Sequence, residues 1–178
     1  GANSQVKIQG LPELARLPQD RESLFYFNLR EIPPRSDKPN TLQIALIGAG
    51  GRGTGAADQA LGQTSLPTKL VAMADVFENK LNESYSGLSN QWKTTPGKVD
   101  VPEDRRFLGF DAYKQALDVL KAGDIAILTT PLAFRAPMFE YAINKGLHVF
   151  MEKPVATDPV GIRKVLEASE QLLPFFAL

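Results

Sequence analysis

Three glycines, Gly48, Gly50 and Gly53, follow a run of apolar residues and form the pattern G-x-G-x-x-G. In a site for a nucleotide diphosphate, the first glycine allows a tight turn, the second lets the backbone approach the phosphates, and the third allows close packing of helix on strand. The amides at the start of the following helix then point toward the phosphates. Glycine-rich turns also join strands to helices for steric reasons alone. The motif by itself therefore leaves a phosphate site and a purely structural turn open.

Asp75 ends the second apolar segment, 22 residues beyond Gly53. A carboxylate at the end of a second strand can accept hydrogen bonds from both hydroxyls of an adenosine ribose. The same charge repels a 2′-phosphate, which favours NAD over NADP unless Arg52 or a nearby lysine compensates. The alternative is a surface aspartate that binds no ligand.

Two later apolar segments end in Thr130-Pro131 and in Glu152-Lys153-Pro154. Lys153 offers a mobile cation that can polarise a hydroxyl or hold an anionic substrate, and as the neutral amine it could take a proton. A solvated loop lysine explains this residue equally well from its chemistry alone.

Strand and helix patterns alternate from Thr41 onward, which predicts a parallel sheet with helices on both faces. We expect a single α/β domain over residues 41–178, a doubly wound Rossmann fold. In such sheets ligands bind at the carboxyl ends of the strands, so the segments described above meet at one edge. The predicted strands cover residues 42–47, 69–74, 106–108, 124–129 and 147–151, with a further strand at 174–178.

Two helices carry more specific predictions. The spacing of Phe77, Leu81, Tyr85 and Leu88 predicts a helix with these four side chains in the core. Asp158-Pro159 is typical of a helix start, with the aspartate as the capping residue.

Residues 1–40 contain five prolines and are predicted to be an N-terminal arm or linker. The aromatic run Leu24-Phe25-Tyr26-Phe27 interrupts this arm. It is expected to pack on the domain surface or on another chain, and the second alternative would give a homo-oligomer.

The composition excludes several classes of function. Twenty basic residues balance twenty acidic residues without a block of like charge, so no nucleic-acid partner is expected. No apolar run reaches the roughly 18 to 20 residues that span a bilayer, so no membrane partner is expected either. With no cysteine and one histidine, His148, thiolate chemistry and multi-histidine metal sites are excluded. The opening Gly1-Ala2-Asn3-Ser4 resembles a processed start, which leaves a cytoplasmic and an exported location open.

Four segments, in this order and spacing, resemble the nucleotide-binding half of the Gfo/Idh/MocA oxidoreductases, which include glucose-fructose oxidoreductase and inositol dehydrogenase. The resemblance covers about residues 42–172 and excludes the arm. Its most specific mark is the Glu-Lys-Pro triplet after a Gly-x-His-Val strand. The matching segments are 45–53, Ala74-Asp75-Val76, Thr130-Pro131 and 146–154.

The resemblance implies a role for each matched residue. The glycine turn and Arg52 would hold the pyrophosphate, and Asp75 would bind the adenosine ribose. Thr130 and Pro131 would lie on the nicotinamide side, Glu152 would approach the nicotinamide ribose, and Lys153 would be the catalytic residue beside the carbon that exchanges hydride. The implied cofactor-binding set is Gly48, Gly50, Gly51, Arg52, Gly53, Asp75, Thr130, Pro131, Phe134, Glu152 and Lys153. The Lys153-Pro154 bond is a candidate cis peptide.

The chain departs from the family pattern in two places. Where many members carry a histidine-containing loop, this chain has Leu132-Ala133-Phe134-Arg135. Phe134 would pack on the nicotinamide, and Arg135 would either meet an anionic group or face water. The chain also ends at Leu178, before the α/β domain that carries the family's substrate pocket, so we expect that domain to be absent.

The resulting prediction is the NAD-binding domain of an oxidoreductase that acts on a sugar or polyol by hydride transfer, not catalytically competent alone. A non-catalytic Rossmann-fold binding or assembly module is the alternative. A methyltransferase ranks below both. Methyltransferases usually carry an acidic residue close before the first glycine of the turn, whereas residues 45–47 are wholly apolar here. The Glu-Lys-Pro triplet would also be unexplained in that class.

Overall fold

The computed structural model describes residues 41–63 and 65–170. The arm predicted over residues 1–40 and the strand predicted over residues 174–178 lie outside this part of the chain. The described residues form one α/β domain that begins at Thr41.

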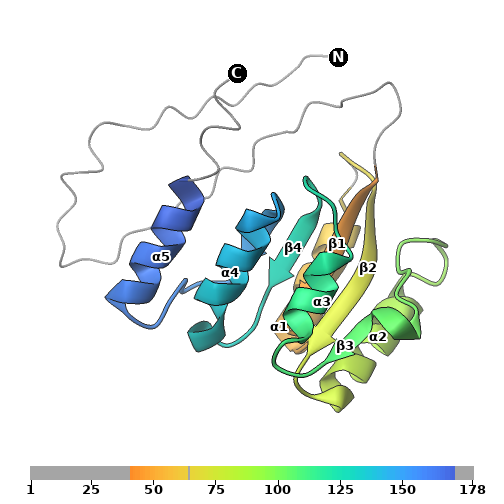
Figure 1. Ribbon diagram of the computed structural model, residues 1–178. Helices are drawn as coiled ribbons and strands as arrows, with labels where there is room; N and C mark the ends of the chain where they lie inside the picture. Colours follow the sequence, from red (N-terminus) through yellow and green to blue (C-terminus); the bar gives the residue numbers. More distant parts are fainter. Residues whose placement is uncertain (1–40, 64, 171–178) are drawn as a thin grey trace. The chain divides into compact units, whose positions relative to one another are not determined.

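A parallel sheet with strand order β3-β2-β1-β4-β5 forms the centre of the domain (Figure 1). β1 pairs with β2 on one side and with β4 on the other, so the strand order reverses beside β1. Such a reversal opens a crevice at the carboxyl ends of the strands. The strands are β1 (Leu42–Ile47), β2 (Thr68–Asp75), β3 (Arg106–Leu108), β4 (Ile125–Leu128) and β5 (His148–Met151).

Helices cover both faces of the sheet, as the alternating pattern predicts (Figure 1). One face packs against α1 (Gly51–Leu61) and α2 (Glu78–Gln91). The other packs against α3 (Ala112–Asp118), α4 (Arg135–Asn144) and α5 (Pro159–Glu170). Two short 3₁₀ turns, η2 (Glu103–Arg105) and η3 (Leu132–Phe134), precede β3 and α4. The predicted Rossmann fold is confirmed.

The apolar sequence of β1 explains why it lies at the centre. Ile44 and Leu46 pack toward α1 and α2, whereas Ala45 and Ile47 pack toward α3 and α4. Successive side chains of a strand point to opposite faces, so a strand covered on both faces has to be apolar throughout. All four side chains are buried.

The helix predictions hold except at one residue. Asp158 caps α5 because its Oδ1 accepts the N–H groups of Val160 and Gly161, both at 2.9 Å. Leu81 and Leu88 are buried, but Phe77 is 63% exposed, so its predicted core position is wrong. Phe77 is the capping residue before α2, and its extended backbone turns the ring away from the helix's apolar face.

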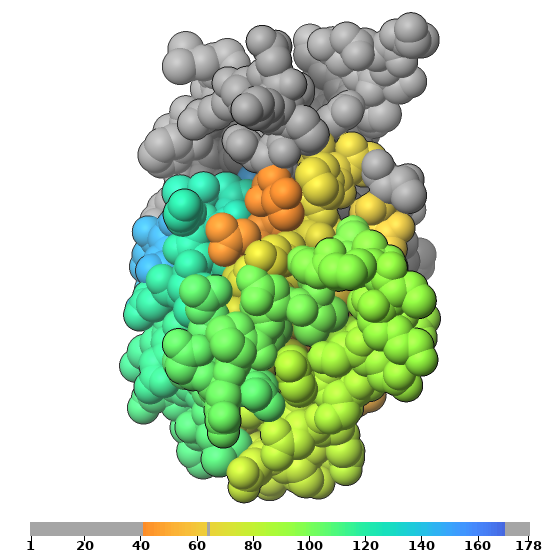
Figure 2. All heavy atoms as spheres, turned by 90° about the vertical axis from the view of Figure 1, so that its right-hand side faces the viewer, coloured from red at the N-terminus to blue at the C-terminus, as the bar shows by residue number. Residues whose placement is uncertain are grey.

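Seen from the β3 side, the surface consists mainly of α2 and the residues between α2 and β3 (Figure 2). Among the described residues, no helix is long and apolar enough to cross a bilayer. The same part of the chain contains no group of three or more side chains suited to hold a metal ion.

Candidate functional site

The glycines of the turn between β1 and α1 have different surroundings. Gly48 has φ +90°, and a Cβ atom there would lie 2.9 Å from the carbonyl carbon of Thr129. At Gly53 a Cβ atom would lie 2.0 Å from the Gly48 oxygen. Among residues 41–63 and 65–170, nothing lies within 4 Å of a Cβ atom built on Gly50 or Gly51. The protein itself therefore requires Gly48 and Gly53, whereas Gly50 leaves open space beside the backbone.

The start of α1 suits an anion. Its capping residue is Gly50, which makes no side-chain cap, and its first turn contains no acidic residue. The amides of a first helical turn lack intrahelical partners and carry partial positive charge. At α5, by contrast, Asp158 occupies that position with its own carboxylate. The α1 amides therefore face the open space at Gly50 without an anionic side chain of their own.

Asp75 lies directly beside this turn. Its Oδ2 accepts the N–H of Ala49 at 2.6 Å, and its Oδ1 accepts the N–H of Phe77 at 2.9 Å. These bonds hold the carboxylate at the end of β2. A carboxylate oxygen can accept a second hydrogen bond, so both oxygens keep capacity for a ligand hydroxyl.

A hollow of about 310 Å³ adjoins the glycine turn between α1 and α2. Thr54 joins the two helices that line this hollow, because its hydroxyl lies 2.9 Å from the Gly50 carbonyl at the start of α1 and 2.7 Å from the Ser84 hydroxyl in α2. No motif in the sequence marks this threonine and serine pair, which lies 30 residues apart. The lining residues are Ala49, Gly51, Thr54, Gly55, Lys80, Glu83 and Ser84.

The end of β4 closes against the glycine turn. Thr129 donates its hydroxyl to the Gly48 carbonyl at 2.7 Å, a contact that sequence reasoning missed. Thr130 is buried, and its hydroxyl points to the sulfur of Met138 at 3.4 Å. In this arrangement the Thr130 hydroxyl points toward α4, and its carbonyl accepts a hydrogen bond from Arg135.

Arg52 connects the glycine turn to the end of β5. Its Nε donates to Oε1 of Glu152 at 2.6 Å, and the two side chains form an ion pair. The Arg52 guanidinium also lies 6.0 Å from the centre of the Phe150 ring. Half of the Arg52 side chain is exposed, so the pair lies at the mouth of the crevice.

One of the two predictions for Arg135 is wrong, because its side chain is 8% exposed and does not face water. Its hydrogen bonds go to main-chain carbonyls, and a contact with an anionic group of a ligand stays a prediction. Nε binds the Thr130 oxygen at 2.8 Å, while Nη1 binds the oxygens of Glu152 at 2.6 Å and Pro154 at 2.5 Å. Burial lowers the pKa of this guanidinium, and the charge of Glu152 opposes that shift.

Lys153 lies between two carbonyls that Arg135 holds, and it is exposed. The Lys153-Pro154 bond is cis, as predicted. Phe134 is 42% exposed and its ring centre lies 6.0 Å from that of Phe110. The carboxyl edge thus brings together the predicted residues of the glycine turn, Asp75, the end of β4 and Glu152.

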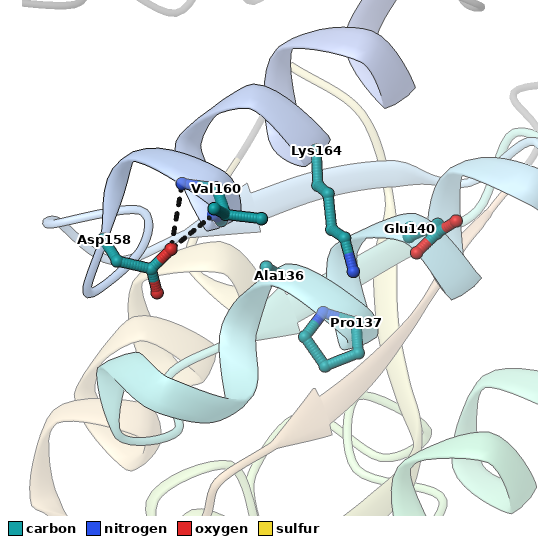
Figure 3. Close-up of a pocket in the computed structure, with 7 residues that line it drawn as sticks. Ala136, Pro137, Glu140, Asp158, Val160 and Lys164 are labelled. Carbon is teal, nitrogen blue, oxygen red and sulfur yellow. Dashed lines mark hydrogen bonds between the residues drawn. The ribbon is translucent and has the colours of Figure 1, made fainter.

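A second hollow, of about 220 Å³, lies between α4 and α5 (Figure 3). Glu140, Asp158 and Lys164 give it mixed charge, and Lys164 extends from α5 toward α4 (Figure 3). The Asp158 carboxylate caps α5. None of the predicted site residues lines this hollow.

A family model described as an oxidoreductase family with an NAD-binding Rossmann fold, GFO_IDH_MocA, matches residues 42–173. A glycosyl hydrolase family 109 protein from Shewanella pealeana is 29% identical over 135 residues. That match covers 75% of this chain but only 27% of the relative. A similar protein from Porphyromonas gingivalis is also 29% identical.

Solved structures show the same likeness. Scyllo-inositol dehydrogenase from Lactobacillus casei, with bound NAD(H) and scyllo-inositol, has a TM-score of 0.53 at 26% identity, over 76% of this chain and 34% of that one. Myo-inositol 2-dehydrogenase from Lactobacillus plantarum has a TM-score of 0.54 at 24% identity, over 74% and 34%. The chain therefore spans about a third of these proteins.

The first residues resemble a different family. A model described as the N-terminal domain of the pili and flagellar-assembly chaperone PapD matches residues 1–48. Chaperone protein PapD from Escherichia coli is 70% identical over 46 residues, which are 26% of this chain and 19% of the chaperone. The two family matches overlap at residues 42–48, and the structure assigns Leu42–Ile47 to β1 of the parallel sheet.

Proposed function

The chain belongs to the Gfo/Idh/MocA oxidoreductase family, and we propose that it binds NAD(H) across the carboxyl edge of its sheet as the cofactor-binding part of a sugar or polyol oxidoreductase. The observation that carries the proposal is the bond of 2.6 Å between the Ala49 N–H and the Asp75 carboxylate. It joins a phosphate-binding turn to a ribose-binding side chain, which are the two requirements for holding an adenosine diphosphate.

The adenosine half of the cofactor has a specific place in this proposal. The diphosphate lies over Gly50 and Gly51, where the backbone is open and the α1 amides are without a side-chain cap. Arg52 adds a positive charge beside the diphosphate. Its side chain either leaves Glu152 for the diphosphate or contacts the Glu152 carboxylate and the diphosphate together. Asp75 accepts the ribose hydroxyls, and its charge disfavours the 2′-phosphate of NADP.

The nicotinamide half lies at the ends of β4 and β5. Thr130 and Pro131 border it with main-chain atoms, and Phe134 offers an exposed ring for stacking. The nicotinamide ring, when bound, supplies hydride transfer. Glu152 accepts a ribose hydroxyl, and Lys153 holds the reacting oxygen of the substrate or takes its proton.

Titration calorimetry with NADH and NADPH tests this proposal. We expect saturable binding of NADH that is tighter than binding of NADPH. The absence of binding heat at millimolar NADH, with a sample shown to be folded by circular dichroism, would contradict it. We also expect no turnover of polyols above background, because small-molecule pockets form preferentially at domain interfaces and the described residues form one domain.

Hydrolysis of a glycosidic bond is a second candidate reaction for the whole protein. It is favoured by the relatives named as family 109 glycosyl hydrolases, which are 29% identical over three quarters of the chain. Some glycoside hydrolases depend on NAD, so this reaction is compatible with the same cofactor site. Release of a sugar from a glycoside without net reduction of NAD would support hydrolysis, and accumulation of NADH would support dehydrogenation.

A further inference from the structure

Arg135 occupies an unfavourable position for a cation. It is the first residue of α4, where the partial charge of the helix end is positive, and its side chain is buried. A buried charge is tolerated only when its hydrogen-bonding groups are satisfied. The contacts that satisfy Arg135 are therefore expected to have a structural or functional consequence.

All three hydrogen-bond partners of the guanidinium are main-chain carbonyls. One belongs to Thr130 at the end of β4, and two belong to Glu152 and Pro154 after β5. A planar guanidinium offers several N–H donors in a fixed geometry, so it can bind separate segments at the same time. Arg135 thus joins the loops that follow the two neighbouring strands.

The two carbonyls bound by Nη1 are those of the residues on either side of Lys153. Because one nitrogen holds both, the backbone turns around it with Lys153 between the two fixed points. Glu152 has further anchors, since its N–H donates to the Leu128 carbonyl at 3.1 Å and its carboxylate pairs with Arg52. Lys153 is exposed, so its backbone is held while its side chain projects outward.

We propose that Arg135 is a positioning residue, which fixes the backbone of residues 152–154 so that Glu152 and Lys153 are presented to the nicotinamide half of the cofactor. The inference rests on the proposed function, because it requires those two residues to contact that half. It assigns to Arg135 an indirect role, because Nε and Nη1 act on the main chain of the two loops.

The first test measures the loop itself and needs no nucleotide. Arg135→Met removes all donors while preserving much of the side-chain length. We expect hydrogen exchange at the Glu152 amide, which donates to the Leu128 carbonyl, to become at least about tenfold faster than in the original protein, while the amides in the second half of α1 keep their exchange rates. Equal protection in the variant and the original protein would overturn the inference.

The second test separates the two halves of the site. ADP occupies only the adenosine half, whereas NADH occupies both, so the ratio of their affinities isolates the nicotinamide half. For Arg135→Met we expect unchanged ADP affinity and NADH affinity weakened about tenfold. A merely structural role would lower both affinities together, and that result would overturn the inference.

Two further variants keep the tests decisive. If Arg135→Met does not fold, Arg135→Lys takes its place in both tests. This variant retains the charge but loses the planar set of donors, so we expect smaller losses of exchange protection and of NADH affinity than those expected for Arg135→Met. Arg163→Met, on the exposed side of α5, is the matched control and should change neither measurement. If the original protein binds neither ADP nor NADH, the proposed function fails, while the exchange measurement still decides whether Arg135 holds the loop.

Discussion

The two halves of the candidate site are built by different means. The adenosine half depends on main-chain geometry: Gly48 and Gly53 meet without room for a Cβ atom, and Asp75 receives main-chain N–H groups. The nicotinamide half depends on side chains that reach across the fold, namely Arg135, which binds the main chain around Lys153, and Glu152, which pairs with Arg52 of the glycine turn. The geometry of the adenosine half is therefore set mainly by backbone sterics, whereas the geometry of the nicotinamide half is set by side-chain hydrogen bonds between segments far apart in the sequence.

The largest expected effect concerns the steric requirement of the adenosine half. Gly53→Ala would bring a Cβ atom to 2.0 Å from the Gly48 oxygen, which is backbone and cannot move aside cheaply. We expect a loss of about 3 kcal/mol or more in the free energy of unfolding, or failure to fold. Urea denaturation measures it, with Gly51→Ala as the control, since nothing lies within 4 Å there. Equal stability of the two variants would mean that the turn is not packed as described.

Gly50→Ala separates ligand approach from folding. The residue has φ −70° and open space beside it, so alanine fits without strain. Unfolding free energy should change by no more than about 0.5 kcal/mol. NADH affinity should fall by at least about tenfold, because the methyl group occupies the space through which the diphosphate approaches. A folded variant with unchanged NADH affinity would remove the diphosphate from this place.

Asp75→Ala tests the side chain that completes the adenosine half. It removes the acceptor for two main-chain N–H groups, so stability should fall by about 1 to 3 kcal/mol. NADH affinity should fall about tenfold through loss of the ribose contact. Asp75→Asn keeps an acceptor without the charge, and we expect it to narrow the preference for NADH over NADPH in calorimetry. An unchanged preference would refute the charge argument.

In the nicotinamide half, Glu152→Gln tests the ion pair with Arg52. The pair is partly exposed, so the unfolding free energy should change by less than about 1 kcal/mol. Asp100→Asn is the matched control, because Asp100 forms an ion pair with Lys69 far from the site residues. Glu152→Gln should lower the ratio of NADH affinity to ADP affinity, because the released Arg52 serves the diphosphate of both ligands while only NADH loses the Glu152 contact, whereas Asp100→Asn should leave this ratio unchanged. Identical behaviour of the two variants would contradict a cofactor role for Glu152.

The smallest expected effect is a pH dependence of stability caused by His148, which is the first residue of β5 and lies at the opposite end of this strand from Glu152. Burial lowers the pKa of His148 below its ordinary value of 6.5, and the charge of Asp124 only partly opposes this. As the pH falls below about 6.5, the unfolded chain takes up a proton that the folded chain resists, so stability declines. His148→Gln should flatten thermal stability between pH 7 and about pH 5 without changing NADH affinity. A decline of the same size in the variant would assign the pH effect to other groups.

The arrangement of the glycine turn and Asp75, which we propose holds the adenosine half, could be predicted because most of its constraints are local. Three glycines and an aspartate at the end of the next strand have fixed spacing, and the close approach of Gly53 to the Gly48 carbonyl arises within one turn. The strands were predictable for a similar reason, since β1 and β2 are apolar on both faces. The Asp158 cap was predictable from two adjacent residues.

The nicotinamide half was predictable only as a set of residues, not as an arrangement. Arg52 and Glu152 are 100 residues apart, and Thr129 and Gly48 are 81 apart. Arg135 was misjudged because its neighbours in sequence give no sign that two loops enclose its side chain. A signal did exist: an arginine in the first turn of a helix lies against the helix dipole, which is typical of a residue with acceptors elsewhere.

The central claim is that one dinucleotide spans both halves of the carboxyl edge. Chemical-shift mapping of ¹⁵N-labelled protein during an NADH titration tests it directly. We predict shifts at the amides of Gly50 and Gly51 and also at Lys153, while ADP shifts only the first two. Shifts confined to the groove between α4 and α5, or no shifts at saturating NADH, would contradict the account.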